Sequence, residues 1–131
     1  MWIRYNANPI SNRVDDCAIR AVSLALGVDW DTAFDLIAYN AKQMGNMMHN
    51  NAVFGSVLRQ AGFNRAIVPN TCPDCYTADD FCRDHPYGVY VLGFGSHVAT
   101  VIDGNIYDTW DSSNEIPIYY WYEKEAFNGV Q

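Results

Sequence analysis

The sequence predicts an α+β fold in which N-terminal helices pack on a C-terminal antiparallel β-sheet. In the first part of the 131-residue chain, apolar residues recur at helical spacing. In the last part, β-rich segments alternate with short Gly-, Asp- and Ser-containing turns. Helices followed by a run of strands are typical of an α+β protein. Half of the residues are hydrophobic and 15% are aromatic, so we expect one domain with a well-packed core.

The first expected helix covers about residues 16–26 and is apolar almost all round. Residues 1–14, which precede it, are polar, and we expect them to be irregular. Asp15 or Asp16 suits the N-cap, and Gly27 suits the left-handed position just after a helix. Because a helix that is apolar on all sides is usually buried, this one should lie between the sheet and the other helices.

Three more helices are expected, each with an N-capping residue at its start. They cover about residues 30–44, 52–61 and 77–85. The caps are Asp29, Asn51 and Thr77, and Gly45 and Gly62 end the first two of these helices.

Five segments have the composition of strands. They cover about residues 63–68, 88–94, 97–102, 105–110 and 116–122. The pair Asp103-Gly104 separates the third and fourth of them, which predicts a hairpin with a two-residue turn. Because the last four strands follow one another closely, we expect them to form an antiparallel meander.

Composition argues against several classes of function. The formal net charge is −7, and the eight basic residues are scattered singly, whereas nucleic-acid binding needs clustered Lys and Arg. No apolar run approaches the ~20 residues of a membrane-spanning helix. Residues 1–5 lack the apolar stretch of a secretory signal. We therefore expect a cytoplasmic protein with no nucleic-acid partner and no membrane association.

Cys17 is the first candidate for chemistry, because it lies where a polar loop gives way to a helix. The free N–H groups and the dipole at a helix N-terminus favour the thiolate, which is the nucleophilic form of cysteine. Asp15 and Asp16 oppose that effect, so a nearby imidazolium would be needed to hold the thiolate. The alternative interpretation is a small buried cysteine that fills a contact between helices.

The expected hairpin supplies a candidate base together with a carboxylate. A two-residue turn makes Ile102 oppose Asn105, and the continued register places His97 and Asp108 as diagonal neighbours on one face. A carboxylate at that position would orient the imidazole ring and stabilise the imidazolium. The alternative interpretation of Asp108 is a solvated strand residue.

Three short blocks of sequence together resemble a small papain-like cysteine peptidase. They are residues 16–21 (Asp-Cys-Ala-Ile-Arg-Ala), 96–101 (Ser-His-Val-Ala-Thr-Val) and 107–111 (Tyr-Asp-Thr-Trp-Asp). The resemblance extends over roughly residues 6–122 and is to bacteriocin-leader-processing peptidases and to short cysteine-peptidase-like proteins of bacterial prophages. It implies a papain-like fold whose central helix carries the cysteine, no cofactor, and a bacterial or phage-infected cell as the setting.

The resemblance also implies a role for each candidate residue in cleaving a peptide or related amide bond. Cys17 would be the nucleophile, His97 the general base and acid, and Asp108 the residue that orients His97. The partner would then be a peptide or protein substrate, and the oligomeric state is left open. Trp110 and His49 are candidates for lining the substrate cleft.

One departure from the papain-like pattern concerns the oxyanion hole. Papain-like enzymes usually carry a Gln a few residues before the cysteine, whose amide joins the cysteine N–H in binding the oxyanion. No Gln precedes Cys17, and Asn12 is the nearest amide upstream. The alternative function is therefore a catalytically weak or inactive binding or adaptor protein on the same fold.

The other cysteines give a third hypothesis, a zinc-stabilised interaction protein. Cys72, Cys75, Cys82 and His85 are four potential ligands, although a single Cys-x-x-Cys motif is weak evidence for zinc. A turn with thiols packed beneath it is the alternative, and no metal site is expected on that interpretation. In the absence of an export signal, we expect all four cysteines of the chain to be free thiols.

Overall fold

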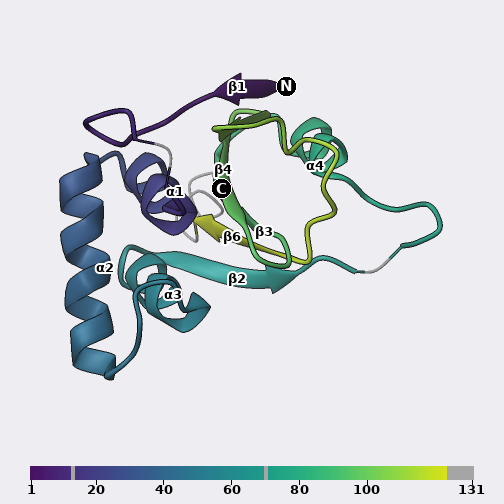
Figure 1. The fold of residues 1–131 in the computed structure, drawn as a ribbon. Helices are drawn as coiled ribbons and strands as arrows, with labels where there is room; N and C mark the ends of the chain where they lie inside the picture. Colours follow the sequence, from purple (N-terminus) through teal and green to yellow (C-terminus); the bar gives the residue numbers. More distant parts are fainter. Residues whose placement is uncertain (13, 70, 124–131) are drawn as a thin grey trace.

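The computed structural model describes residues 1–12, 14–69 and 71–123, and these form helices on both sides of one mixed sheet (Figure 1). The elements in chain order are β1 (Trp2–Arg4), α1 (Cys17–Leu26), α2 (Trp30–Met44), α3 (Asn51–Gln60), β2 (Phe63–Ile67), α4 (Ala78–Asp84), β3 (Val89–Gly93), β4 (Val98–Ile102), β5 (Asn105–Asp108) and β6 (Tyr119–Glu123). Helices α1, α2 and α3 lie on one side of the sheet, and α4 lies on the other. The α+β class is thereby confirmed.

The sheet differs from the expected one at both edges and in the place of β6, which pairs with β3 rather than with β5, so the last four strands do not form a simple meander. Its strand order is β1-β5-β4-β3-β6-β2, so the edge strands are β1 and β2, which precede the other four in the sequence. Residues 1–14 are not wholly irregular, because Trp2 pairs with Ile106 and β1 runs parallel to β5. The expectation of a purely antiparallel, C-terminal sheet is therefore wrong. A strand of three residues is too short to show alternation in the sequence.

Helix α1 has the central position that its apolar surface predicts. It contacts β3 and β4 on one side and α2 and α3 on the other. Gly27 ends it with a φ of 68°, in the left-handed region that glycine adopts without strain. The Oγ1 of Thr100, on β4, donates a hydrogen bond of 2.8 Å to the carbonyl oxygen of Ala21, which ties the helix to the sheet.

Two apolar clusters fill the space on either side of the sheet. The cluster beneath α1, α2 and α3 includes Val22, Phe54 and Trp121. The cluster beneath α4 includes Phe81 and Val101, with Tyr120 packed against it. Successive residues of β6 thus enter opposite clusters, as the alternation of a strand buried on both faces requires.

The β4–β5 hairpin has the register that the sequence predicts. Ile102 pairs with Asn105, Val101 with Ile106, and Thr100 with Tyr107. The turn residues Asp103 and Gly104 have φ angles of 50° and 78°, which a two-residue type I′ turn demands of both positions. This register determines which side chains of β5 share a face with His97.

Among the residues that the structure describes, no helix is long and apolar enough to cross a membrane.

Candidate active site

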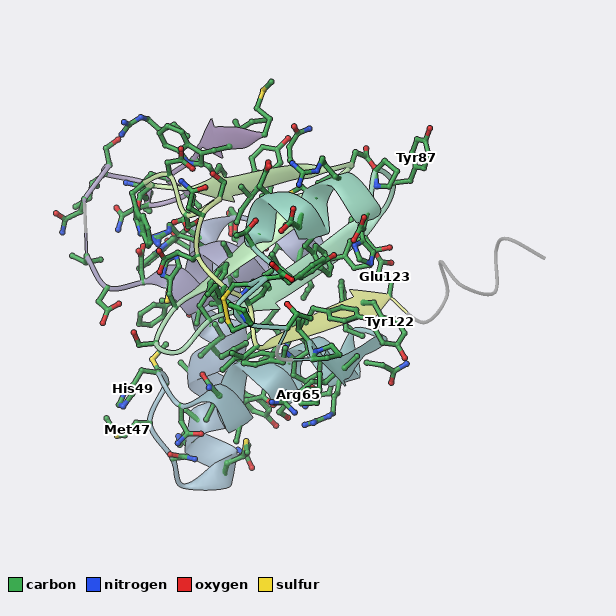
Figure 2. The ribbon with its side chains drawn as sticks, turned by 90° about the vertical axis from the view of Figure 1, so that its right-hand side faces the viewer. Met47, His49, Arg65, Tyr87, Tyr122 and Glu123 are labelled. Carbon is green, nitrogen blue, oxygen red and sulfur yellow. A yellow bond between two sulfur atoms is a disulfide. The ribbon has the colours of Figure 1, made fainter. Side chains whose placement is uncertain are left out.

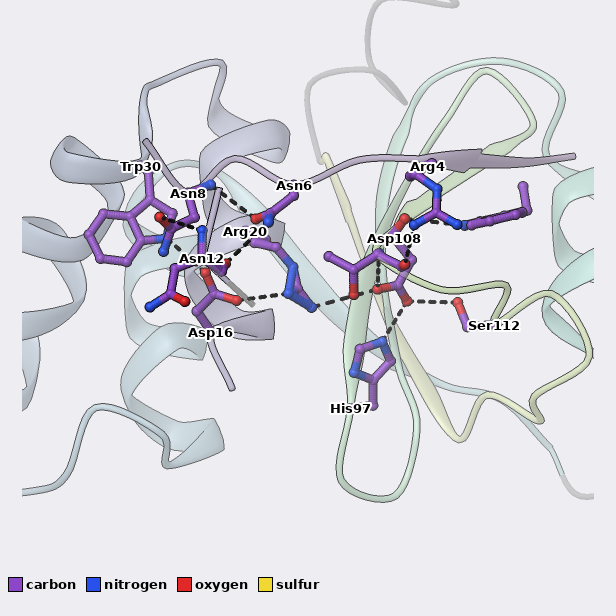
Figure 3. Close-up of polar contacts among 12 residues, drawn as sticks. Arg4, Asn6, Asn8, Asn12, Asp16, Arg20, Trp30, His97, Asp108 and Ser112 are labelled. Atoms are coloured by element: carbon purple, nitrogen blue, oxygen red, sulfur yellow. Dashed lines mark hydrogen bonds and ion pairs between the residues drawn. The ribbon is translucent and has the colours of Figure 1, made fainter. Parts of the chain in front are cut away.

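Cys17 is the first residue of α1, and its partly exposed side chain lines a cleft. The residue before it, Asp16, occupies the N-cap position, but its carboxylate does not cap the helix. It accepts hydrogen bonds from Nη1 of Arg20 at 2.8 Å and from Nε1 of Trp30 at 2.9 Å (Figure 3). No side chain of the described residues caps α1, so its first N–H groups are left for another acceptor.

The pairing of Asp16 also changes the electrostatics that the sequence suggested. Asp16 is 5% exposed, and the Arg20 guanidinium neutralises it within the same helix turn. The carboxylate therefore opposes a thiolate at Cys17 less than an isolated aspartate would. Asp15 is exposed, where water screens its charge.

His97 lies just before β4 and is held by Asp108 at the end of β5. Its Nε2 is 2.5 Å from Oδ2 of Asp108, and the Asp108 side chain is 2% exposed. The same Oδ2 accepts a 2.8 Å hydrogen bond from the Ser112 hydroxyl, and Oδ1 accepts one from the Thr109 backbone N–H. Because its acceptor sites are used, this buried carboxylate is fixed in orientation (Figure 3).

The Cys17 thiol and the His97 imidazole both line the cleft, and each shifts the pKa of the other. Since Nε2 of His97 is taken by Asp108, Nδ1 is the ring nitrogen that remains for the thiol. The structure thus brings the Cys17 thiol, the His97 imidazole and the Asp108 carboxylate together at one end of the cleft.

The pKa values of this pair move toward each other. Burial by itself raises the pKa of the Cys17 thiol, but the hydrogen bonds from His97 and from the Val98 backbone, with the charges of His97 and Arg20, bring it below its ordinary value. Burial lowers the pKa of His97, yet the hydrogen bonds to Asp108 and Cys17 outweigh it and raise the value to about 9. Both shifts favour the thiolate–imidazolium ion pair.

The cleft in front of Cys17 has a volume of about 510 Å³. Its walls come from the start of α1 and the loop before it, from α2, from the loop between α2 and α3, from the start of α3, and from the start of β4 and the segment before it. Apolar lining is provided by Phe34, Met48 and Phe54, and polar lining by His49, Asn51 and Ser96. In Figure 2, His49 and Met47 project from the α2–α3 loop at the edge of the molecule.

The two candidates for the substrate cleft have different positions. His49 lines the cleft. Trp110 is not among the residues that line it, but its ring packs against His97, with centroids 5.2 Å apart. Trp110 therefore shields the imidazole and the Asp108 hydrogen bond from one side.

Asn12, the candidate oxyanion donor, is exposed and is not among the residues that line the cleft. Its backbone N–H donates to Oδ1 of Asn8, and its carbonyl accepts from the Asn6 amide, which fixes the loop rather than the site (Figure 3). Among the lining residues, the side-chain amide belongs to Asn51, at the start of α3. The sequence did not indicate Asn51 as a candidate, because Asn51 is far from Cys17 in the chain and only the fold brings α3 to the cleft.

The expectation of free thiols is wrong for two of the four cysteines. Cys72 and Cys75 form a disulfide, which removes both from the candidate metal ligands, whereas Cys17 and Cys82 are free. His85 stacks on Phe81, and its Nδ1 bonds the Phe81 carbonyl oxygen. Within the described part of the chain, no group of three or more His, Cys, Asp or Glu side chains is placed to hold a metal ion.

Two residues of the site were missed by the sequence reasoning. Arg20 bridges Asp16 to Asp108, with Nη2 3.6 Å from the Asp108 Oδ1, and Ser112 donates to the same carboxylate. The four-residue spacing of Asp16 and Arg20 on one helix face was a usable signal for the first contact.

No protein family model, no curated protein and no solved structure matches the chain.

Proposed function

We propose that the protein is a papain-like thiol hydrolase that cleaves a peptide or related amide bond. One observation carries this proposal: the His97 imidazole, which lines the cleft together with Cys17 and lowers the pKa of its thiol, has Nε2 2.5 Å from the buried Asp108 carboxylate. A thiol at a helix N-terminus with such a partner has the geometry and the pKa direction of an activated nucleophile.

In the proposed reaction, the Cys17 thiolate attacks the carbonyl carbon of the scissile amide, and a C–S bond forms as the carbonyl oxygen takes the negative charge. The uncapped N–H groups of the first turn of α1 are the donors available to that oxyanion. The His97 imidazolium then gives its proton to the leaving nitrogen, and the C–N bond breaks.

The acyl-enzyme that results is a thioester of Cys17. His97, now neutral, takes a proton from water as that water attacks the thioester carbonyl. The C–S bond breaks, the acid product leaves, and the thiolate–imidazolium pair is restored. Asp108 keeps the ring oriented in both steps and stabilises its charged form without giving up or taking a proton.

A catalytically weak binding protein is the second candidate function. The position of Asn12 outside the cleft favours it, because the side-chain amide expected upstream of the nucleophile is not at the site. Apolar residues such as Phe34 and Met48 would then bind a peptide segment in the cleft without cleaving it.

Labelling with an electrophilic peptide probe at neutral pH tests the hydrolase proposal. Intact-mass measurement should show one adduct on the wild type, none on Cys17→Ala, and one on Cys82→Ala, which removes the other free cysteine as a matched control. A mixture of peptides should then be cleaved by the wild type and not by Cys17→Ala. Rapid labelling without any Cys17-dependent cleavage would favour the binding protein, and labelling that persists in Cys17→Ala would refute the assignment of the nucleophile.

A further inference from the structure

A second pocket, of about 230 Å³, lies beside the cleft between α3 and the sheet edge formed by β6 and β2. Its lining comprises Asn51, Ala52, Arg59, Arg65, Tyr119 and Trp121. We call it the arginine pocket. Two of the eight basic residues of an otherwise acidic chain thus meet in one small cavity.

Strand register and helix position explain this convergence. Arg65 on β2 is the Cα partner of Trp121 on β6, and Tyr119 lies two residues earlier on the same face. Arg59 lies in the last turn of α3, which packs above that face. The guanidinium of Arg65 lies 4.5 Å from the Tyr119 ring centroid, and that of Arg59 lies 5.0 Å from the Trp121 ring centroid. Figure 2 shows Arg65 at this edge, near β6.

Both aromatic residues carry a buried polar atom that has no partner in the described part of the chain. Tyr119 is 4% exposed and Trp121 is 2% exposed, and neither the Tyr119 hydroxyl nor the Trp121 Nε1 has a hydrogen-bond partner among the described residues. Native structures contain few such groups, because an unsatisfied buried donor is destabilising. Two residues that line the pocket thus each carry a donor that no described residue satisfies.

Within the described ranges, the two arginines have no anionic partner. Neither Arg59 nor Arg65 forms an ion pair with a carboxylate of the described residues, in contrast to Arg20 and Arg83. Both are exposed and held over aromatic faces, which leaves the N–H edges of their planar groups available. An oxyanion that accepts from two guanidinium groups gains charge-assisted and bidentate hydrogen bonds.

The pocket adjoins the proposed catalytic cleft. Asn51 lines both cavities. The Tyr119 ring packs directly over Gly93, where an added Cβ would lie 2.0 Å from the ring. Gly93 in turn pairs with Val98, the residue after His97. A substrate that extends from Cys17 past Asn51 would therefore reach the arginines.

We infer that the arginine pocket binds a carboxylate of the peptide substrate, either an acidic side chain or a C-terminal α-carboxylate, adjacent to the cleft. This inference rests on the proposed function, since it names the class of substrate that the Cys17 site would act on. A cavity of this size accommodates one small anionic group. A nucleic-acid backbone would need an extended basic track, which a chain of net charge −7 with scattered basic residues does not offer.

Binding of small N-acetylated amino acids to the full chain tests the inference without any need for cleavage. The readout is the indole N–H resonance of Trp121 in NMR spectra. N-acetylglutamine carries only the α-carboxylate, N-acetylglutamate α-amide carries only the side-chain carboxylate, and N-acetylglutamine amide is neutral. We expect a saturable shift with at least one of the two carboxylates and none with the neutral compound. Comparison of the two compounds shows whether the pocket binds an α-carboxylate or a side-chain carboxylate.

Variants establish that the arginines are responsible. Arg59→Gln and Arg65→Gln should each weaken carboxylate binding by about tenfold or more, since each removes charge-assisted hydrogen bonds. Arg83→Gln is the matched control, because Arg83 is an exposed arginine on α4, on the other side of the sheet, and should leave the affinity unchanged. Four outcomes would overturn the inference. The first two are the absence of a saturable shift and an equal shift with the neutral compound. The others are unchanged affinity in both arginine variants and tighter binding of inorganic phosphate than of either carboxylate.

The outcome is separable from that of the hydrolase proposal. Carboxylate binding with no Cys17-dependent cleavage would refute the hydrolase proposal and support the carboxylate site. Cleavage with no carboxylate binding would support the hydrolase proposal and refute the carboxylate site. If both proposals hold, a cleaved peptide with Glu at the position that reaches the pocket should have a higher kcat/KM than its Gln counterpart. That preference should disappear in Arg65→Gln and persist in Arg83→Gln.

Discussion

Arg20 on α1 lies against Asp108 on β5, with Nη2 3.6 Å from the carboxylate Oδ1 (Figure 3). His97 uses the other oxygen of that carboxylate, so Asp108 contacts two cationic groups at once. Through Nη1, the same guanidinium contacts Asp16, immediately before Cys17, the proposed nucleophile. Arg20 therefore joins the helix that carries Cys17 to the hairpin that carries His97, and it acts as a positioning residue through the two aspartates.

Replacement of Arg20 by Gln should raise the pKa of the Cys17 thiol, because the Arg20 charge is one of the influences that lower it. The pH dependence of iodoacetamide alkylation measures this pKa directly. Loss of a buried partner for two carboxylates should also destabilise the fold by about 3 kcal/mol, measured by urea unfolding. Arg20→Lys retains the charge and should recover part of the pKa shift. An unchanged alkylation profile in folded Arg20→Gln would show that Arg20 is only structural.

The pH profiles of alkylation and hydrolysis should differ on the alkaline side. Below the lowered pKa of Cys17 the thiol is protonated, so both rates fall with decreasing pH. Alkylation needs only the thiolate and should stay high above that pKa. Hydrolysis also needs the His97 imidazolium as an acid, so kcat/KM should fall as pH rises through about 9. In His97→Gln, the alkylation midpoint should rise to or above the ordinary thiol value of 9.0. A midpoint that stays low in this variant would refute the ion pair.

Asp108→Asn should lower the pKa of His97, since the Asp108 hydrogen bond and charge are major influences that raise it. The imidazolium then holds the thiolate less well, and we expect hydrolysis to slow by about 10²-fold or more. Ser112→Ala removes one of the donors to the same carboxylate but leaves Asp108 in place, so it should slow hydrolysis less. NMR titration of the His97 ring measures the shift. Equal effects of the two substitutions would contradict the role of Asp108 as the direct partner of His97.

The elements that the sequence predicts well are those with local signals. Helix α1 has a terminal glycine with a positive φ, and the β4–β5 hairpin has an Asp-Gly turn whose φ angles fix the register. Because that register fixes which residues share a face, the contact between His97 and Asp108 was predictable from a turn of two residues. The cysteine, histidine and aspartate of the site follow from these two elements.

The features that the sequence does not predict depend on contacts between distant residues. Strand β1 has three residues and pairs with a strand that lies about a hundred positions later. Asn51 enters the cleft because α3 packs near α1, and no local pattern indicates this. The disulfide between Cys72 and Cys75 was missed because the choice between thiols and a disulfide was based on compartment rather than on local geometry.

Asn51→Ala should test whether the cleft amide completes an oxyanion hole. Asn51 is the first residue of α3, whereas Asn50 provides the cap, so the substitution should leave the helix intact. Loss of an oxyanion donor reduces kcat by about 10²–10³-fold with little change in KM. Asn12→Ala is the matched control, because Asn12 is an exposed amide that is not among the lining residues, and it should retain activity. If Asn12→Ala lost more activity than Asn51→Ala, Asn12 would be the donor and would have to enter the cleft during turnover.

Gly93→Ala should disrupt the packing that joins the candidate active site to the arginine pocket. An added Cβ at this position would lie 2.0 Å from the Tyr119 ring, and Tyr119 is 4% exposed with little room to move. Overpacking of this kind is destabilising by about 1–3 kcal/mol or more, measured as a lower midpoint of urea unfolding. Gly95→Ala is the matched control two residues away, because its added Cβ would meet nothing within 4 Å and should change stability little. If Gly93→Ala were as stable as Gly95→Ala, the Tyr119 ring would not lie against β3, and the continuity between the two cavities would be lost.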